Sequence, residues 1–322
     1  MHRLLALALA TTTAACGFGL ADDSSGGRDD LPQSGAGPFK KLEVDDTTAA
    51  DEPWIATDPV LELTEAALTA RPGGGHVVYV TREPAAEPAG DTTIWRAELP
   101  DRRELPTPFV EVLTADRTWE EGHVGAPAIV REGDVLVMFY AAGVDSVGRA
   151  DSIDGGLTWT KWPAPVLTGV TSPAIGYDGA TWLLAFIDET GAIGLARSDD
   201  GHEFTRATAP ILTARTDDPG AFDHVAVAAP SLAWLVEGTG RGHWALWYAG
   251  LEESPGEGER PLYAIGYAAS WDGASWSRLP GNRPIAAAPA TEPTVALDDN
   301  HGVMAYTAPN GRRQSIGLAV TP

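Results

Sequence analysis

Two acidic residues stand directly before a proline in similar segments of the chain. Asp58 precedes the proline of "TDPVLEL" (57 to 63), and Glu292 precedes the proline of "TEPTVA" (291 to 296). Two carboxyl groups that face one ligand can act as general acid and general base when their surroundings separate their pKa values. We therefore consider Asp58 a candidate base or nucleophile and Glu292 a candidate proton donor, if the fold brings them together.

A second group of candidates combines aromatic and acidic side chains. Two segments align on their prolines, "TWEEGHVGAP" (118 to 127) and "AFDHVAVAAP" (221 to 230). The alignment pairs Trp119 with Phe222 and Glu120 with Asp223, which makes Asp223 a third candidate carboxylate. An aromatic face beside a hydrogen-bonding group suits a polar, ring-shaped ligand such as a sugar. The candidate binding residues are Trp54, Trp119, Glu120, Ser172, Phe222 and His224.

A sequence repeat should position these residues. Turns of the form S-x-D, followed by glycine and an aromatic residue, surround Asp154, Asp200 and Asp272, where we expect the aspartates to accept backbone N–H groups. Each turn follows a glycine-containing strand, and each unit also has a hydrophobic strand and a proline-marked strand. The proline-marked strands are "TDPVLEL", "GAPAIV", "TSPAIG", "AAPSLA" and "TEPTVA". Five units of four short strands predict an all-β, five-bladed β-propeller with four-stranded blades.

A propeller would gather the residues that precede the marker prolines. Proline lacks an N–H and fits an edge strand, and the innermost strand of a blade is the edge beside the central channel. One channel mouth should therefore be surrounded by Asp58, Ala126, Ser172, Ala229 and Glu292. Because blades one and five are neighbours in a closed ring, Asp58 and Glu292 should face one ligand. The last unit has no closing strand, so we expect "GPFKKLEV" (37 to 44) to complete blade five and close the ring.

The N-terminal sequence predicts export. A basic start and the run "LLALALATTTAAC" resemble a bacterial lipoprotein signal, with residues 1 to 15 as signal peptide and Cys16 as the lipidated residue. Cys16 is the only cysteine, so anchoring is its simplest use. Residues 16 to 37 then form a flexible tether, and residues 38 to 322 form the propeller. We expect a monomer that is lipid-anchored to a bacterial membrane and faces the periplasm or the cell exterior.

Composition narrows the classes of function. The formal net charge is −23, which repels nucleic acids and anionic lipid surfaces. The histidines are scattered without metal-ligand spacing, and the sequence has no phosphate-binding glycine loop and no nucleophile elbow. We therefore predict no metal site and no cofactor.

The five units, the "xDP" start of the first and the turns with tryptophan resemble the glycoside hydrolase superfamily of arabinanases, β-xylosidases, invertases and levansucrases. The resemblance covers about residues 38 to 322 and implies an oligo- or polysaccharide as partner. It places the catalytic aspartate of the first blade at Asp58. The second aspartate and the acid glutamate of that superfamily would fall at Ser172 and Ala228, so this sequence lacks both carboxylates.

Two functions therefore stay open. The first is hydrolysis of glycosidic bonds in the channel mouth through Asp58 with Glu292 or Asp223. The second is a non-catalytic surface propeller that binds a glycan or a protein at the same mouth. A sialidase-type hydrolase is disfavoured, because that fold has six blades and a cluster of three arginines, and the sequence shows no such cluster.

Overall fold

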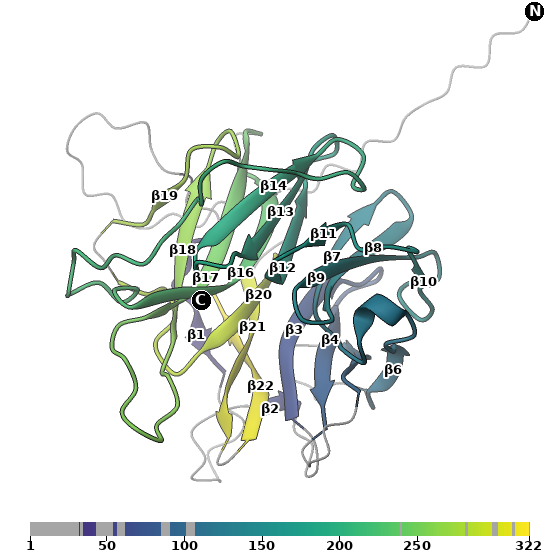
Figure 1. Ribbon diagram of the computed structural model, residues 1–322, viewed down its shortest axis with the longest axis horizontal. Coiled ribbons are helices and arrows are strands. Elements are labelled where there is room, and N and C mark those ends of the chain that lie inside the picture. Colours follow the sequence, from purple (N-terminus) through teal and green to yellow (C-terminus); the bar gives the residue numbers. More distant parts are fainter. Residues whose placement is uncertain are drawn as a thin grey trace, which may run out of the picture.

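The structure is a computed structural model of the 322-residue chain. It describes residues 32, 35–42, 54–56, 62–84, 91–100, 107–238, 240–280, 283–297, 302–310 and 313–321. The strands form five antiparallel sheets around a central axis (Figure 1). The prediction of a five-bladed β-propeller is thereby confirmed.

Each blade is a meander whose strands run outward from the channel. Blade one consists of β3 (Glu62–Ala70), β4 (His76–Glu83), β5 (Thr93–Leu99) and β6 (Val110–Leu113). Blade two consists of β7 (Val124–Glu132), β8 (Val135–Ala142), β9 (Ser146–Ser152), β10 (Thr160–Lys161) and β11 (Leu167–Thr168). Blade three consists of β12 (Thr171–Tyr177), β13 (Trp182–Ile187), β14 (Ile193–Ser198) and β15 (Thr205–Arg206).

The last two blades follow the same order. Blade four consists of β16 (Ala226–Val236), β17 (Gly242–Leu251), β18 (Ala264–Ser270) and β19 (Ser277–Arg278). Blade five consists of β20 (Thr291–Leu297), β21 (Gly302–Asn310), β22 (Arg313–Val320) and, from the other end of the chain, β1 (Lys40–Lys41) and β2 (Trp54–Ala56). The innermost strands β3, β7, β12, β16 and β20 contact one another in a ring.

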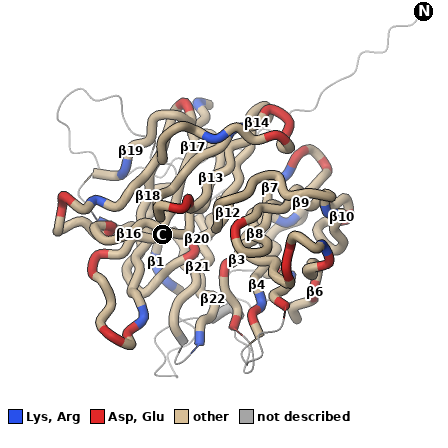
Figure 2. Tube along the Cα trace, in the orientation of Figure 1, with Lys and Arg blue, Asp and Glu red and all other residues tan. Residues whose placement is uncertain are grey.

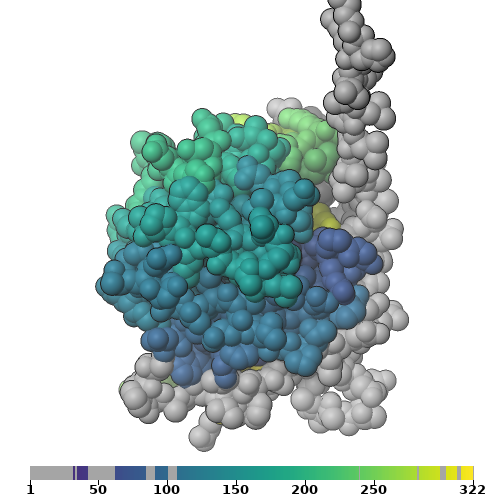
Figure 3. All heavy atoms as spheres, turned by 90° about the vertical axis from the view of Figure 1, so that its right-hand side faces the viewer, coloured from purple at the N-terminus to yellow at the C-terminus, as the bar shows by residue number. Residues whose placement is uncertain are grey.

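The hydrophobic core is divided into five clusters, one between each pair of neighbouring blades. The second strand of a blade packs against a neighbour on both faces, so its residues are apolar in an unbroken run rather than in alternation. In β8, for example, Leu136, Val137, Met138, Phe139 and Tyr140 are all buried. From the side, the outer surface of the first three blades is continuous (Figure 3).

The N-terminal segment closes the ring. In β1, Lys40 pairs with Val320 and Lys41 with Ala319, both on β22. Upstream of β1, the Trp247 indole N–H donates to Gly35 O at 2.8 Å, which ties the segment to blade four. The expected completion of blade five by residues near 37 to 44 is confirmed.

The repeated turns have the structural role that the sequence predicts. Ser152 Oγ donates to Asp154 Oδ1, which also accepts the N–H groups of Leu157 and Thr158, and the Asp200 and Asp272 turns repeat this pattern. Gly156 has a φ of +83°, and a Cβ there would collide with the Tyr79 hydroxyl of blade one. These aspartates and glycines therefore seat each turn against the preceding blade.

Two strand assignments differ from the sequence prediction. The innermost strand of blade one is β3, which begins at Glu62, whereas we expected it at residues 57 to 63. Ala66 occupies the place of the marker proline, so the proline pattern identified the wrong segment. The outer strand of blade two also differs, because it consists of two short pieces, β10 and β11, which pair one after the other with β9 (Lys161 with Ala150, and Leu167 with Val147).

Acidic side chains and helical structure lie mainly outside the sheets that form the fold. Asp and Glu lie mainly in loops and turns at the rim of the molecule (Figure 2). Within the described residues the 3-10 helix η1 (Thr118–Glu120) is the only helix, and no helix has the length and apolar character needed to cross a membrane.

Candidate functional site

Five residues with a left-handed backbone surround one mouth of the channel. Each lies at a β-bulge in the innermost strand of its blade, where the pairing with the second strand shifts register. The five are Glu65 (φ 52°), Ala126 (44°), Ser172 (50°), Ala229 (44°) and Glu292 (51°). Non-glycine residues rarely adopt this conformation, and such strain concentrates at functional sites. We call these five residues the mouth ring.

The mouth ring confirms the predicted positions of four residues and corrects the fifth. Ala126, Ser172, Ala229 and Glu292 precede their prolines as expected. In blade one the equivalent residue is Glu65, not Asp58, because β3 begins four residues after position 58. Asp58 lies outside the described residues.

Glu65 and Glu292 are joined by a hydrogen bond between blades one and five. Glu65 N–H donates to Glu292 Oε2 at 2.9 Å and is also 3.1 Å from Thr307 Oγ1 on β21. Glu65 Oε2 in turn accepts from Thr81 Oγ1 on β4 and from Ala126 N–H, both at 2.8 Å. The two carboxylates are therefore held in fixed places by groups from neighbouring blades.

The site favours the protonated form of one carboxyl group. Burial, followed by the negative charge of Glu65, raises the pKa of Glu292 to about 7. Burial and then the charges of Glu65 and Glu62 raise the pKa of Glu83, which accepts a hydrogen bond from Thr64 Oγ1 at 3.4 Å. At neutral pH, a substantial fraction of Glu292 is therefore protonated beside the carboxyl group of Glu65.

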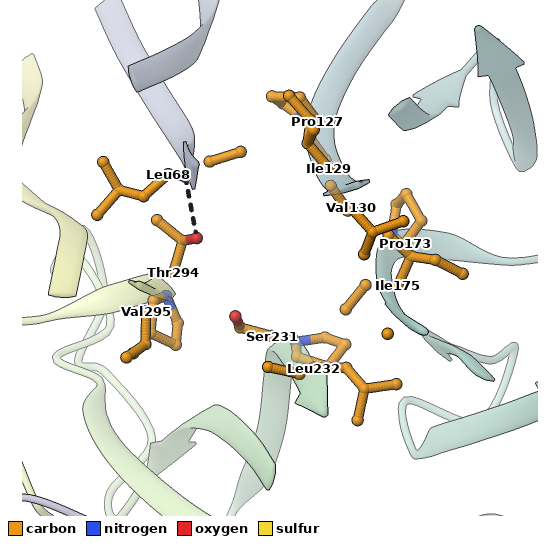
Figure 4. A pocket seen from close by; sticks show the side chains of 18 of the residues that line it. Leu68, Pro127, Ile129, Val130, Pro173, Ile175, Ser231, Leu232, Thr294 and Val295 are labelled. Carbon is orange, nitrogen blue, oxygen red and sulfur yellow. Dashed lines mark hydrogen bonds between the residues drawn. The ribbon is translucent and has the colours of Figure 1, made fainter. Parts of the chain in front are cut away.

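The central channel behind the mouth ring is lined mostly by residues with apolar side chains. Its cavity of about 260 Å³ is lined by all five innermost strands. Figure 4 shows the side chains of Leu68, Ile129, Ile175, Leu232 and Val295 around it, together with the hydrogen bond from Leu68 N to Thr294 Oγ1 (3.3 Å).

A second cavity of about 420 Å³ lies on the mouth side, against blades three, four and five. Its polar lining comes mainly from Ser172, Arg260, Tyr263, Glu292, Thr307 and Gln314. The volume falls in the range of small-molecule sites. Burial and the charge of Glu292 raise the pKa of Tyr263, which lines the same cavity. We call this space the mouth cavity.

Comparison with known proteins identifies the architecture. No protein-family model matches the sequence, and a search of curated proteins gives no match. A glycosyl hydrolase from Bacteroides ovatus is similar in structure, with a TM-score of 0.68 and 16% identity over 91% of this chain and 96% of that chain. The chain has the five-bladed fold of these hydrolases.

Two further solved structures have the same fold. One is from the GH130 family of mannoside phosphorylases, which contains glycoside hydrolases that target β-1,2 mannosidic linkages in Candida mannan; its TM-score is 0.61, with 16% identity over 94% of this chain and 96% of that chain. The other is an exo-1,5-α-L-arabinanase from a bovine ruminal metagenomic library, with a TM-score of 0.58 and 14% identity over 82% of this chain and 94% of that chain.

Of the residues predicted from sequence, the propeller brings Ser172 and Glu292 together in the mouth cavity. Asp58 and Cys16 lie outside the described residues, as does the side chain of Trp54. The remaining predicted residues belong to two anchors that hold loops onto blades two and four: Trp119, Glu120, Phe222, Asp223 and His224.

The anchor in blade four is centred on Asp223, which is fully buried. Its carboxylate accepts from Arg215 Nε at 2.5 Å, Arg278 Nε at 2.9 Å and Tyr248 Oη at 2.9 Å, and Phe222 packs on the Tyr248 ring. Since both oxygens are engaged, the geometry favours an anchoring role for Asp223 over proton transfer. His224 Nδ1 lies 3.0 Å from Arg215 O in the same loop.

The anchor in blade two has the same design. Glu120 is fully buried, and its carboxylate accepts from Lys161 Nζ at 2.7 Å and Tyr140 Oη at 2.8 Å. Trp119 stacks on Tyr140, and its indole N–H donates to Pro163 O. Glu120 and Asp223 therefore have equivalent places in their blades, as their alignment predicts. Each carboxylate binds a tyrosine hydroxyl and a basic side chain.

Sequence reasoning missed Glu65 and its partners Thr81 and Thr307. Glu65 is the second glutamate of the strand "ELTEAALTA", and its place directly before the apolar stretch "AAL" was its one visible signal. Within the described part of the chain, no group of three His, Cys, Asp or Glu residues is arranged to hold a metal ion.

Proposed function

We propose that the protein acts on carbohydrate at the channel mouth and cleaves glycosidic bonds with Glu292 as proton donor. The observation that carries this proposal is the pKa of Glu292, raised to about 7 beside the negative charge of Glu65. A general acid works best when its pKa lies near the working pH. The hydrolases of similar fold support carbohydrate as the class of substrate.

Glycoside hydrolysis also needs a second carboxylate as base or nucleophile. Glu65 is the candidate from the structure, because it is the mouth-ring residue next to Glu292 and is held by Thr81 and Ala126. Asp58 is the candidate from the sequence resemblance. Glu65 and Asp58 are therefore the two alternatives for the base or nucleophile.

Sugar release from arabinan, xylan, mannan and fructan panels tests the proposal. Glu292→Gln should lower turnover at pH 7 by about a hundredfold or more, since general acid catalysis contributes on that order. Glu65→Gln and Asp58→Asn then identify the second carboxylate, because the true partner should lose activity to a similar extent. Glu111→Gln, on exposed strand β6, is the matched control and should retain activity.

The alternative function is non-catalytic binding of a glycan at the same mouth. It is favoured by the small residues at three mouth-ring positions, Ala126, Ser172 and Ala229, which leave no further carboxylate there. Binding on a glycan array, without release of sugar by the purified chain, would favour this alternative.

We also propose export and anchoring through Cys16, on the strength of the "LLALALATTTAAC" segment. Cell fractionation tests this point, because Cys16→Ala should move the protein from the membrane fraction to the soluble extracytoplasmic fraction. Gel filtration of the tether-free chain tests the expected monomer.

A further inference from the structure

At two bulges of the mouth ring, the backbone N–H group donates to the side-chain carboxyl group of a glutamate. At Glu65 this N–H donates to the carboxylate of Glu292 from the preceding blade, and at Ala126 it donates to the carboxylate of Glu65. Each N–H also meets a threonine hydroxyl of the preceding blade, Thr307 or Thr81. Two of the five bulges therefore bind a carboxyl oxygen that the protein itself supplies.

The other three bulges have the same backbone but different neighbours. Ser172, Ala229 and Glu292 share the left-handed φ and the shift of strand register that also mark the bulges at Glu65 and Ala126. At Glu65 and Ala126, the acceptors on the preceding blade are a glutamate and a threonine. At the other three bulges, the equivalent two positions of the preceding blade carry small or apolar side chains. These facing pairs are Ala126 with Ala141 for Ser172, Ser172 with Ile187 for Ala229, and Ala229 with Ala249 for Glu292.

The mouth cavity lies beside Ser172 and Ile187, which face Ala229, and beside Ala229, which faces Glu292. It is lined by Ser172, Ala229 and Glu292, the three bulges that face no glutamate, and by the facing residue Ile187. Arg260, from the connection between β17 and β18, lies on its wall. A guanidinium group and aligned backbone N–H groups are hydrogen-bond donors without acceptor atoms, and together they suit an oxyanion.

We propose that the mouth cavity binds the oxyanion of an acidic ligand through the N–H groups of Ala229 and Glu292 together with Arg260. Glu292 and Glu65 show the geometry, because their own carboxylates occupy the equivalent positions in the next two blades. The proposed ligand is a uronic acid residue, whose carboxylate supplies the oxyanion. Inorganic phosphate could supply the same kind of oxyanion. This inference rests on the proposed carbohydrate function and specifies its class of substrate.

Isothermal titration with D-galacturonate, D-galactose and inorganic phosphate tests the inference. Galacturonate should bind about tenfold or more tightly than galactose, because charge-assisted hydrogen bonds distinguish the two. Ala229→Glu should abolish galacturonate binding, since the new carboxylate would face Glu292 N–H as Glu65 faces Ala126 N–H. Arg260→Gln should weaken binding by about tenfold.

Val236→Glu is the matched control for Ala229→Glu. It adds the same charge to the same strand, but at an exposed position seven residues further along β16, roughly 20 Å away. It should bind galacturonate as the unmodified chain does. If Ala229→Glu does not fold, Ser172→Glu provides the same block opposite Ala229 N–H.

The outcomes separate this inference from the hydrolase proposal. Galacturonate binding that is lost in Ala229→Glu supports the inference even if no sugar is released, and in that case only the hydrolytic function fails. Phosphate binding with the same loss supports the site and identifies phosphate as the ligand source. Equal affinity for galactose and galacturonate, or binding unchanged in Ala229→Glu, overturns the inference.

Discussion

Replacing Glu292 by glutamine should change the pH dependence of the free energy of unfolding. Burial and the charge of Glu65 raise the pKa of Glu292 from 4.5 to about 7 in the folded protein. Between these two values the folded protein keeps a proton that the unfolded chain has released. The stabilising contribution of Glu292 is therefore fully present below about pH 4.5 and is lost as the pH rises through about 7.

The two pKa values set the magnitude of this effect. Linkage gives a loss of about 2.5 kcal/mol between about pH 5 and about pH 8. Glutamine stays neutral over this range, and its amide oxygen can still accept the hydrogen bond from Glu65 N–H. Relative to the unmodified chain, Glu292→Gln should therefore gain about 2.5 kcal/mol on going from the lower to the higher pH.

Urea denaturation at the two pH values measures this difference. Glu111→Gln, which removes an exposed carboxyl group on β6, corrects for the loss of one negative charge from the whole molecule. If the unmodified chain and Glu292→Gln show parallel pH dependence, folding does not keep Glu292 protonated. The argument for Glu292 as general acid at neutral pH would then fail.

The buried anchor and the ring closure allow two more tests. Asp223→Asn removes the negative charge shared by Arg215 and Arg278 and should lower the free energy of unfolding by about 3–5 kcal/mol, measured by urea denaturation. Asp199 forms an exposed ion pair with Arg197, so Asp199→Asn should lower the free energy of unfolding by less than about 1 kcal/mol. A chain truncated before residue 43 lacks β1 and should melt at a lower temperature and associate through the exposed edge of β22, whereas an equally stable monomer would contradict the closing role.

The sequence was sufficient to predict the propeller and its closure. The turns around Asp154, Asp200 and Asp272 depend on contacts within a few residues, and the apolar strands depend on local composition. Because these local patterns recur in five units, the number of blades could be predicted from the sequence. The incomplete fifth unit then indicated that the N-terminal segment must supply a strand, which β1 does.

The candidate site followed from the sequence only in part. Glu292 and Ser172 were predictable because each precedes a marker proline, and Asp223 was correctly aligned with Glu120. The anchoring contacts of those two acids were not predictable, since their partners Arg278 and Lys161 are 55 and 41 residues away. The sequence does not show whether the carboxylate of an acidic residue is buried among hydrogen-bond donors or exposed to solvent.

Tertiary structure alone decided that Glu65 is the neighbour of Glu292. The two residues are 227 positions apart, and their contact depends on the strand register of blade one and on the bulge that turns the backbone of Glu65 to a positive φ. Register is set by pairing with β4 and by burial against two neighbouring blades, and none of these constraints is local. The sequence therefore determined how many blades there are, whereas packing around the ring determined which side chains meet at its mouth.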